Sequence, residues 1–130
     1  MSVNVLVFAS QKGGSGKSTM AASVAVAAVE AGESVVAVDM DPQGTLAEWG
    51  RLREAGDIVF RSVEAAKLTA WIEDVRSRGK TSLLVIDTPG TFGPAVNRAM
   101  REASLCLVPV RPSAPDLKAA APTVEAIQTL

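Results

Sequence analysis

The chain has 130 residues, of which 48% are hydrophobic and 21% are charged, so it can form one globular domain with a buried core and does not have the composition of a disordered segment. Its formal net charge of −1 provides no general attraction to nucleic acids or anionic membranes. The absence of histidine and the single cysteine exclude the usual zinc sites and a disulfide framework.

Short apolar runs alternate with longer helical patterns along the chain. We expect strands at residues 3–9, 34–38, 58–63, 83–86 and 105–110. We expect helices from residue 16 or 17 to Gly32, and over 45–55, 64–78, 94–103 and from 116 onward. Because the apolar runs are nearly continuous, the strands should be buried on both faces. The sequence therefore predicts an α/β fold, with a mostly parallel sheet and helices on both of its faces.

The segment from residue 116 carries apolar residues at helical spacing up to Leu130, without a glycine cap or a polar tail. We therefore expect a single domain, residues 1–130, that is truncated at its C-terminus in mid-fold. No apolar run approaches the length of a membrane span, and the default compartment is the cytoplasm.

A glycine-rich segment, KGGSGKST at residues 12–19, follows the first predicted strand and opens the first predicted helix. Its glycines let successive backbone N–H groups point at one anion, and the helix N-terminus adds its dipole. In the P-loop pattern, Lys17 contacts the β- and γ-phosphates of a nucleotide and Ser18 binds Mg²⁺. The predicted nucleotide-binding residues are Lys12, Gly13, Gly14, Ser15, Gly16, Lys17, Ser18 and Thr19.

Two carboxylates, Asp39 and Asp41, follow the apolar run at residues 35–38. Side-chain alternation along a strand predicts that both lie on the same side of the sheet. They would then lie at the carboxyl edge, where open α/β folds bind ligands and metals. The alternative is that these aspartates cap a helix or are solvated.

A third acidic position, Asp87, ends the apolar run at residues 83–86 and precedes Thr88, Pro89 and Gly90. Taken alone, an acid at the end of a strand favours a structural role. After a P-loop it matches a Walker B motif, which predicts that Asp87 holds Mg²⁺ and that residues 88–90 sense the γ-phosphate.

The P-loop segment departs from the ordinary pattern, because Gln11 stands where glycine is usual and Lys12 is an additional lysine. With DMDPQ at residues 39–43 and VPVRPSAPDL at 108–117, these motifs resemble the ParA/MinD family of deviant Walker A P-loop ATPases, and the ParA-type partition proteins most. The resemblance covers almost the whole chain. It implies that Lys12 reaches the partner's phosphates in a nucleotide-sandwich dimer, that Asp39 organises Mg²⁺ or its waters, and that Asp41 positions or activates the attacking water.

The resemblance implies a slow, partner-stimulated ATPase that binds ATP or ADP with Mg²⁺ and forms an ATP-dependent homodimer. By the same resemblance, such a dimer would bind non-specific DNA, partly through regions outside this chain. It would respond to a ParB-like or other activating protein and position a plasmid, chromosome or protein-cluster cargo. No membrane partner is expected. The alternatives are a MinD-like membrane-site regulator, which Pro42 and Gln43 disfavour, and a metabolic or metal-carrier ATPase. A lone Cys106 cannot hold an iron–sulfur cluster.

Basic residues in the segment from 51 to 101 are candidates for part of a DNA surface. Acidic residues are interleaved with them, and aromatic residues are scarce. This mixture favours solvated helix faces over a nucleic-acid interface.

Overall fold

The computed structural model describes residues 2–10, 16–90 and 93–110, together with 118, 121–122, 124–125 and 127–129. Strands and helices alternate over the first 107 residues, as predicted. The elements are β1 (Asn4–Phe8), α1 (Lys17–Glu30), β2 (Val35–Asp39), α2 (Thr45–Leu52), β3 (Val59–Ser62), a 3₁₀ turn (Ala65–Lys67), α3 (Leu68–Arg78), β4 (Leu83–Asp87), α4 (Pro94–Glu102) and β5 (Leu105–Leu107).

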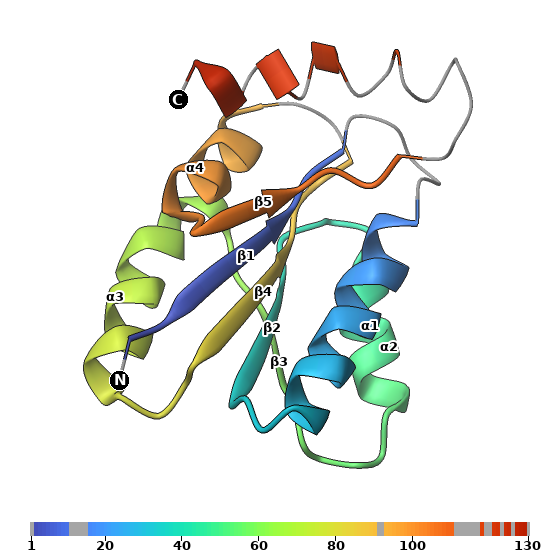
Figure 1. Cartoon of the computed structure of the whole chain (residues 1–130), viewed down its shortest axis with the longest axis vertical. Helices are drawn as coiled ribbons and strands as arrows, with labels where there is room; N and C mark the ends of the chain where they lie inside the picture. Colours follow the sequence, from blue (N-terminus) through green and yellow to red (C-terminus); the bar gives the residue numbers. More distant parts are fainter. Residues whose placement is uncertain are drawn as a thin grey trace.

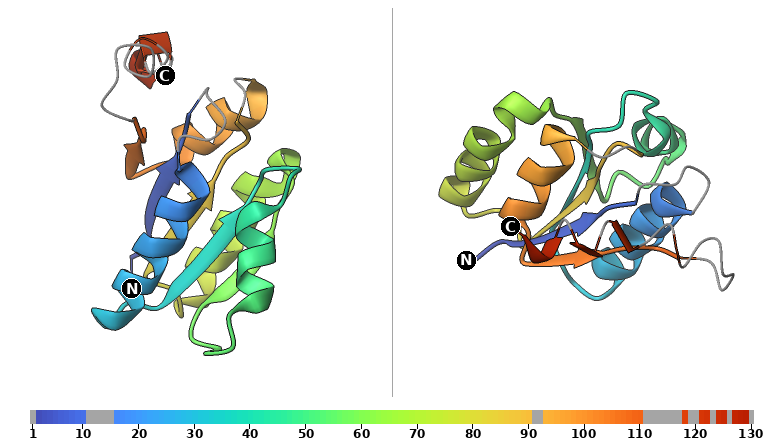
Figure 2. Two further views of the ribbon diagram at one scale, coloured as in Figure 1. Left: turned by 90° about the vertical axis from the view of Figure 1, so that its right-hand side faces the viewer. Right: turned by 90° about the horizontal axis from the view of Figure 1, so that it is seen from above.

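The five strands form one sheet in the order β3-β2-β4-β1-β5, and every neighbouring pair is parallel. Helices α1 and α2 cover one face of this sheet, and α3 and α4 cover the other (Figures 1 and 2). The predicted α/β fold is therefore confirmed. Because all strands run the same way, the ends of β1, β2 and β4 meet at one edge, the carboxyl edge.

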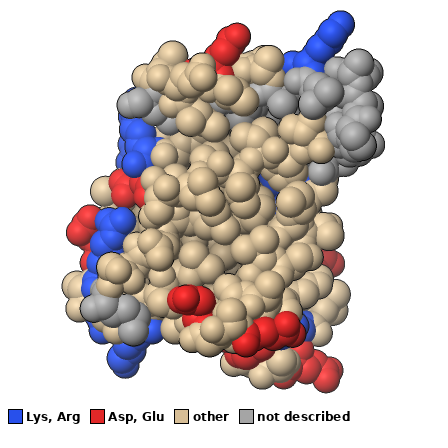
Figure 3. Space-filling model, in the orientation of Figure 1, with Lys and Arg blue, Asp and Glu red and all other residues tan. Residues whose placement is uncertain are grey.

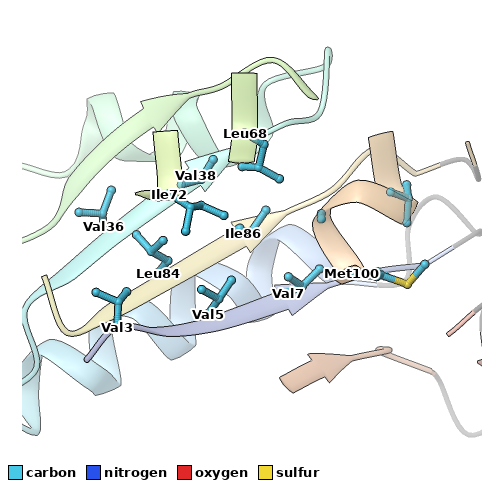
Figure 4. Close-up of a cluster of buried hydrophobic side chains, with 13 residues drawn as sticks. Val3, Val5, Val7, Val36, Val38, Leu68, Ile72, Leu84, Ile86 and Met100 are labelled. Carbon is cyan, nitrogen blue, oxygen red and sulfur yellow. The ribbon is translucent and has the colours of Figure 1, made fainter. Parts of the chain in front are cut away.

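Each face of the sheet has its own hydrophobic core. On one face, strand side chains such as Val5 and Val7 pack with Leu68 and Ile72 of α3 and with residues of α4 (Figure 4). On the other face, Phe8 and its neighbours pack against α1 and α2. The small residues of α1 let that helix approach the sheet closely, and they are buried: Ala21, Ala22 and Ala25. Burial on both faces explains the continuous apolar character of the strands.

Three elements fall short of their predicted bounds by three residues or more: β5, α2 and α3, which begins at Leu68 after the 3₁₀ turn and not at residue 64. Strand β5 ends at Leu107 instead of continuing to residue 110, and Pro109 cannot donate a hydrogen bond to a strand ladder. Helix α2 ends at Leu52, because the backbone of Arg53 is extended. The Arg53 guanidinium pairs with Asp57 at 2.7 and 2.9 Å. The helix predicted from residue 116 lies partly outside the described residues. None of the helices in the described part of the chain is long and apolar enough to cross a membrane.

Candidate functional site

Buried polar side chains gather at the carboxyl edge of the sheet. Of the six buried polar or charged residues that the structure describes, all but Thr81 lie there: Ser10, Lys17, Asp39, Asp87 and Thr88. Strands β2 and β4 pair so that Asp39 lies opposite Asp87 at the last position of each strand. Two carboxylates are thus held side by side at the edge where open α/β folds bind ligands.

The first turn of α1 is tied directly to Asp87. Gly16 precedes the helix with a φ of 85°, a left-handed conformation that favours glycine, and makes Lys17 the first helical residue. The Lys17 ammonium donates to one carboxylate oxygen of Asp87 and to the main-chain carbonyl of Thr88. The Ser18 hydroxyl donates to the other carboxylate oxygen of Asp87 at 2.6 Å. The predicted P-loop helix and the predicted Walker B aspartate therefore share one site.

The Asp87 carboxyl is completely buried, and its environment acts on its charge in two directions. Burial raises the pKa of Asp87, and the negative charge of Asp39 raises it further. The hydrogen bonds from Lys17 and Ser18 and the charge of Lys17 lower this pKa, but burial is the largest effect. A carboxylate in this position is stabilised by a cation beside it, which is the property required of a metal ligand.

Thr88 holds the segment after β4 against the end of β1. Its buried hydroxyl donates to the Phe8 carbonyl at 2.7 Å, and its N–H donates to the same carbonyl at 3.3 Å. These bonds orient the Thr88 carbonyl that accepts from Lys17. Sequence reasoning missed this carbonyl, because a main-chain acceptor leaves no signal in side-chain identity.

The structure places Asp39 and Asp41 differently from each other. Strand β2 ends at Asp39, so the side-chain alternation on which their common side was predicted does not extend to Asp41. Asp39 accepts from the N–H groups of Asp41 and Ala47, at 2.9 and 2.8 Å. Asp41 is half-buried and accepts from the N–H of Gln43 at 3.0 Å. Among the described residues, no hydrogen bond or ion pair joins this pair of aspartates to Lys17, Ser18 or Asp87.

The remaining predicted nucleotide-binding residues cannot be placed in the same way. Lys12, Gly13, Gly14 and Ser15 lie outside the described residues. Thr19 is exposed on α1, where it lies at a groove of about 560 Å³ between α1 and α2 that Ser18, Leu46 and Trp49 also line. This groove runs along the two helices beside the carboxyl edge.

A model of the CobQ/CobB/MinD/ParA nucleotide-binding domain matches residues 6–129 of the chain. The chain belongs to this family. The match spans the site formed by Lys17, Ser18 and Asp87, and it confirms the resemblance to ParA and MinD drawn from the motifs.

Two curated relatives are similar over most of this chain. The ParA protein of Rhizobium radiobacter is 30% identical over 125 residues, which are 95% of this chain and 55% of the relative. A protein from Gloeobacter kilaueensis named for the maintenance of carboxysome distribution, protein A, is 38% identical over 104 residues, which are 80% of this chain and 47% of the relative. The chain thus spans about half the length of these relatives.

Solved structures share the fold at low sequence identity. A plasmid partition protein from Borrelia burgdorferi matches with a TM-score of 0.81 at 15% identity, over 98% of this chain and 74% of the other. McdA from Cyanothece in complex with ATP matches with a TM-score of 0.72 at 19% identity, over 98% of this chain and 64% of the other. The pNOB8 ParA protein bound to nonspecific DNA matches with a TM-score of 0.72 at 18% identity, over 92% of this chain and 57% of the other. These likenesses show that the family fold is present.

The donor set at the carboxyl edge fits a magnesium ion bound together with a nucleotide. Mg²⁺ in such sites takes one or two protein oxygen ligands and completes its shell with phosphates and waters. Ser18 and Asp87 supply a hydroxyl and a carboxylate within hydrogen-bond distance of each other. Over the described part of the chain, no three His, Cys, Asp or Glu side chains cluster to form a metal cage. The hydroxyl of Ser18 and the carboxylate of Asp87 are the kind of protein ligands expected for a cation that also binds phosphates.

The basic side chains of the surface are largely mixed with acidic ones. On the face shown in Figure 3, most Lys and Arg lie near the margins, several of them close to Asp and Glu, and most of the middle is neither basic nor acidic. Three arginines pair with acids close in sequence: Arg53 with Asp57, Arg76 with Glu73, and Arg78 with Asp74. These pairs agree with the interpretation of solvated helix faces.

Proposed function

We propose that this chain binds Mg-ATP at the carboxyl edge of its sheet and hydrolyses it to ADP and phosphate. The observation that carries the proposal is the convergence of Lys17 and Ser18, at the start of α1, on the two oxygens of Asp87. Membership of a nucleotide-binding family supports it, as does the ATP complex of McdA from Cyanothece.

Each residue of this convergence has a distinct role in the proposal. Lys17 would exchange its contact with Asp87 for the β- and γ-phosphates, where its charge offsets the charge that develops during phosphoryl transfer. Ser18 and Asp87 would hold the magnesium ion, which neutralises phosphate charge when bound. The N–H groups of residues 13–16 would bind phosphate oxygens at the start of α1.

Asp41 would orient the attacking water or accept its proton, because its half-buried carboxylate lies in the loop that follows β2 at the same edge. Asp41→Ala should bind ATP like the unaltered chain, but its rate of phosphate release should be at least about 100-fold lower. Asp74→Ala, which removes an exposed aspartate of α3, is the matched control and should release phosphate normally. Unchanged phosphate release by Asp41→Ala would remove Asp41 from the mechanism.

The proposal extends to a switch that positions a cargo. ATP would promote a homodimer in which Lys12 contacts the phosphates of the partner, and this dimer would bind non-specific DNA. A ParB-like or other activating protein would stimulate slow hydrolysis, and the ADP form would release the DNA. The cargo would be a plasmid, chromosome or protein cluster: the name of the carboxysome-distribution relative supports a protein cluster, and the plasmid partition protein of similar fold supports a plasmid. The DNA complex of pNOB8 ParA supports the nucleoid as the surface.

The dimer can be tested by measuring molar mass with light scattering. Asp41→Ala should be dimeric with Mg-ATP and monomeric with Mg-ADP, and adding Lys12→Gln should abolish the dimer. Adding Lys80→Gln instead, at an exposed lysine, should leave the dimer intact. A monomer under every condition, with ATP bound, would contradict the switch for this chain.

A further inference from the structure

Asp39 has both of its carboxylate oxygens engaged by main-chain N–H groups. Its Oδ1 accepts from Asp41 at 2.9 Å, and its Oδ2 accepts from Ala47, in the first turn of α2, at 2.8 Å. Asp39 as a residue is only 4% exposed, so these two bonds largely replace the hydration of its carboxylate. The carboxylate therefore joins the two ends of the loop between β2 and α2.

Helix α2 requires such a contact because it has no cap of its own. The residue before its first turn is Gly44, which has no side chain and takes a left-handed φ of 67°. The first N–H groups of a helix lack partners within the helix, and they are stabilised by a negative charge nearby. Asp39 supplies this charge from the end of β2, across the loop.

Asp87, the neighbour of Asp39 in the sheet, has a different set of partners. Its oxygens accept from the side chains of Lys17 and Ser18, which can move to a nucleotide without a change in the main chain. The partners of Asp39 are backbone groups, and losing them would loosen the loop at Asp41 and the first turn of α2 at Ala47, while the N–H of Met40 would still donate to the Asp87 carbonyl at 2.9 Å. Each oxygen of Asp39 thus already holds one main-chain N–H, so a metal ion at Asp39 would have to share both oxygens with these two bonds.

We propose that Asp39 is a positioning residue for hydrolysis and not a magnesium ligand: it holds the loop of residues 40–44 so that Asp41 keeps its place at the site. The loop is short and internally bonded, since the Asp41 carbonyl accepts from Gly44 at 2.9 Å and the Asp41 carboxylate from Gln43 at 3.0 Å. Fixing the N–H of Asp41 thus fixes the whole turn that carries the Asp41 carboxylate. This inference rests on the proposed function and replaces the magnesium role predicted for Asp39.

Asp39→Asn is the variant that separates the two roles. Asparagine keeps the shape of the side chain, but only one of its two terminal atoms accepts hydrogen bonds. Either Asp41 or Ala47 then loses its partner, and the negative charge at the start of α2 is lost. Asp39→Glu keeps the negative charge on a longer side chain and serves as the conservative variant. Asp87→Asn is the reference for loss of a magnesium ligand.

The first readout is independent of catalysis. Amide hydrogen exchange is measured by NMR on the 130-residue chain. In Asp39→Asn, the amide of Asp41 or of Ala47 should exchange at least about tenfold faster than in the unaltered chain. Amides in β4, such as that of Val85, should exchange as in the unaltered chain. Unchanged exchange at both Asp41 and Ala47 would overturn the positioning role.

The second readout compares magnesium dependence with turnover. In Asp39→Asn, the Mg²⁺ concentration needed for half-maximal ATP binding should stay within about twofold, while kcat falls about tenfold to 100-fold. Asp39→Glu should recover part of kcat. In Asp87→Asn, the Mg²⁺ requirement itself should rise. A rise in the Mg²⁺ requirement of Asp39→Asn as large as that of Asp87→Asn would overturn the proposal and assign Asp39 to the metal.

These outcomes distinguish the inference from the function on which it rests. If the unaltered chain neither binds nor hydrolyses ATP, the proposed function fails, and the positioning role in hydrolysis fails with it. The exchange experiment then still decides whether Asp39 holds the loop. If the unaltered chain turns over ATP and Asp39→Asn matches it in kcat, only the inference about Asp39 fails.

Discussion

The two ends of the sheet satisfy their polar groups in different ways. At the amino end, Ser82 and Ser34 exchange exposed hydrogen bonds of 2.8 and 2.9 Å, and Ser82 accepts from the N–H of Asn4 at 3.0 Å. At the carboxyl end, Lys17, Asp39 and Asp87 are buried with their charges. Burying a charge opposes folding unless partners compensate it, whereas exposed hydroxyls cost little. The difference indicates that the amino end joins strands and that the carboxyl end is built to bind a ligand.

The largest effect should come from breaking the buried ion pair at the carboxyl end. Lys17→Ala leaves the Asp87 carboxylate without its cation and should lower the free energy of unfolding by about 3–5 kcal/mol. Adding Asp87→Asn removes the uncompensated charge and should recover most of this loss. Lys80→Ala, at an exposed lysine, should change stability by less than about 0.5 kcal/mol. Urea unfolding measures all of them, and a double variant no more stable than Lys17→Ala would contradict the charge argument.

A smaller effect is expected where the carboxyl end loses a neutral hydrogen bond. Thr88→Val keeps the shape of the side chain but removes the hydroxyl that donates to the Phe8 carbonyl at 2.7 Å. The carbonyl retains the longer bond from the Thr88 N–H, so the free energy of unfolding should fall by about 1–2 kcal/mol. Thr69→Val, which removes an exposed hydroxyl on α3, is the matched control for thermal unfolding. Equal losses in the free energy of unfolding of the two variants would show that burial at the carboxyl end does not strengthen the contribution of this hydrogen bond.

The smallest effect belongs to the amino end. Ser82→Ala removes exposed hydrogen bonds to Ser34 and Glu33, and water can replace them. The free energy of unfolding should change by no more than about 0.5 kcal/mol. ATP affinity, measured in the same preparation, should be unchanged, because the residue lies at the opposite end of the strands. A large loss in either quantity would erase the contrast between the two ends.

The features that could be predicted from the sequence are those that depend on local pattern. Continuous apolar runs indicated the five strands, and the glycine-rich segment followed by Lys17 indicated where α1 begins. The position of Asp87 at the end of a buried strand was also predictable, since the run of residues 83–86 precedes it. The family match confirms the motif-based resemblance.

The features that could not be predicted depend on the geometry of loops. The partners of Asp39 follow from where β2 stops and from the left-handed turn at Gly44, and together these bring Ala47 to the carboxylate. Residue spacing leaves open whether such an aspartate meets a metal or a helix. The end of α2 at Leu52 was not predictable either, because Arg53 leaves the helix with an extended backbone although the helical pattern continues to residue 55.

The central claim, that the carboxyl end binds a magnesium nucleotide, is tested most directly by isothermal titration calorimetry with ATP. The unaltered chain and Lys80→Ala should bind about one nucleotide per chain in the presence of Mg²⁺, and more weakly with EDTA. Lys17→Ala/Asp87→Asn, confirmed as folded by circular dichroism, should bind at least about 100-fold more weakly. Binding of ATP by this folded double variant with the affinity of the unaltered chain would contradict the account.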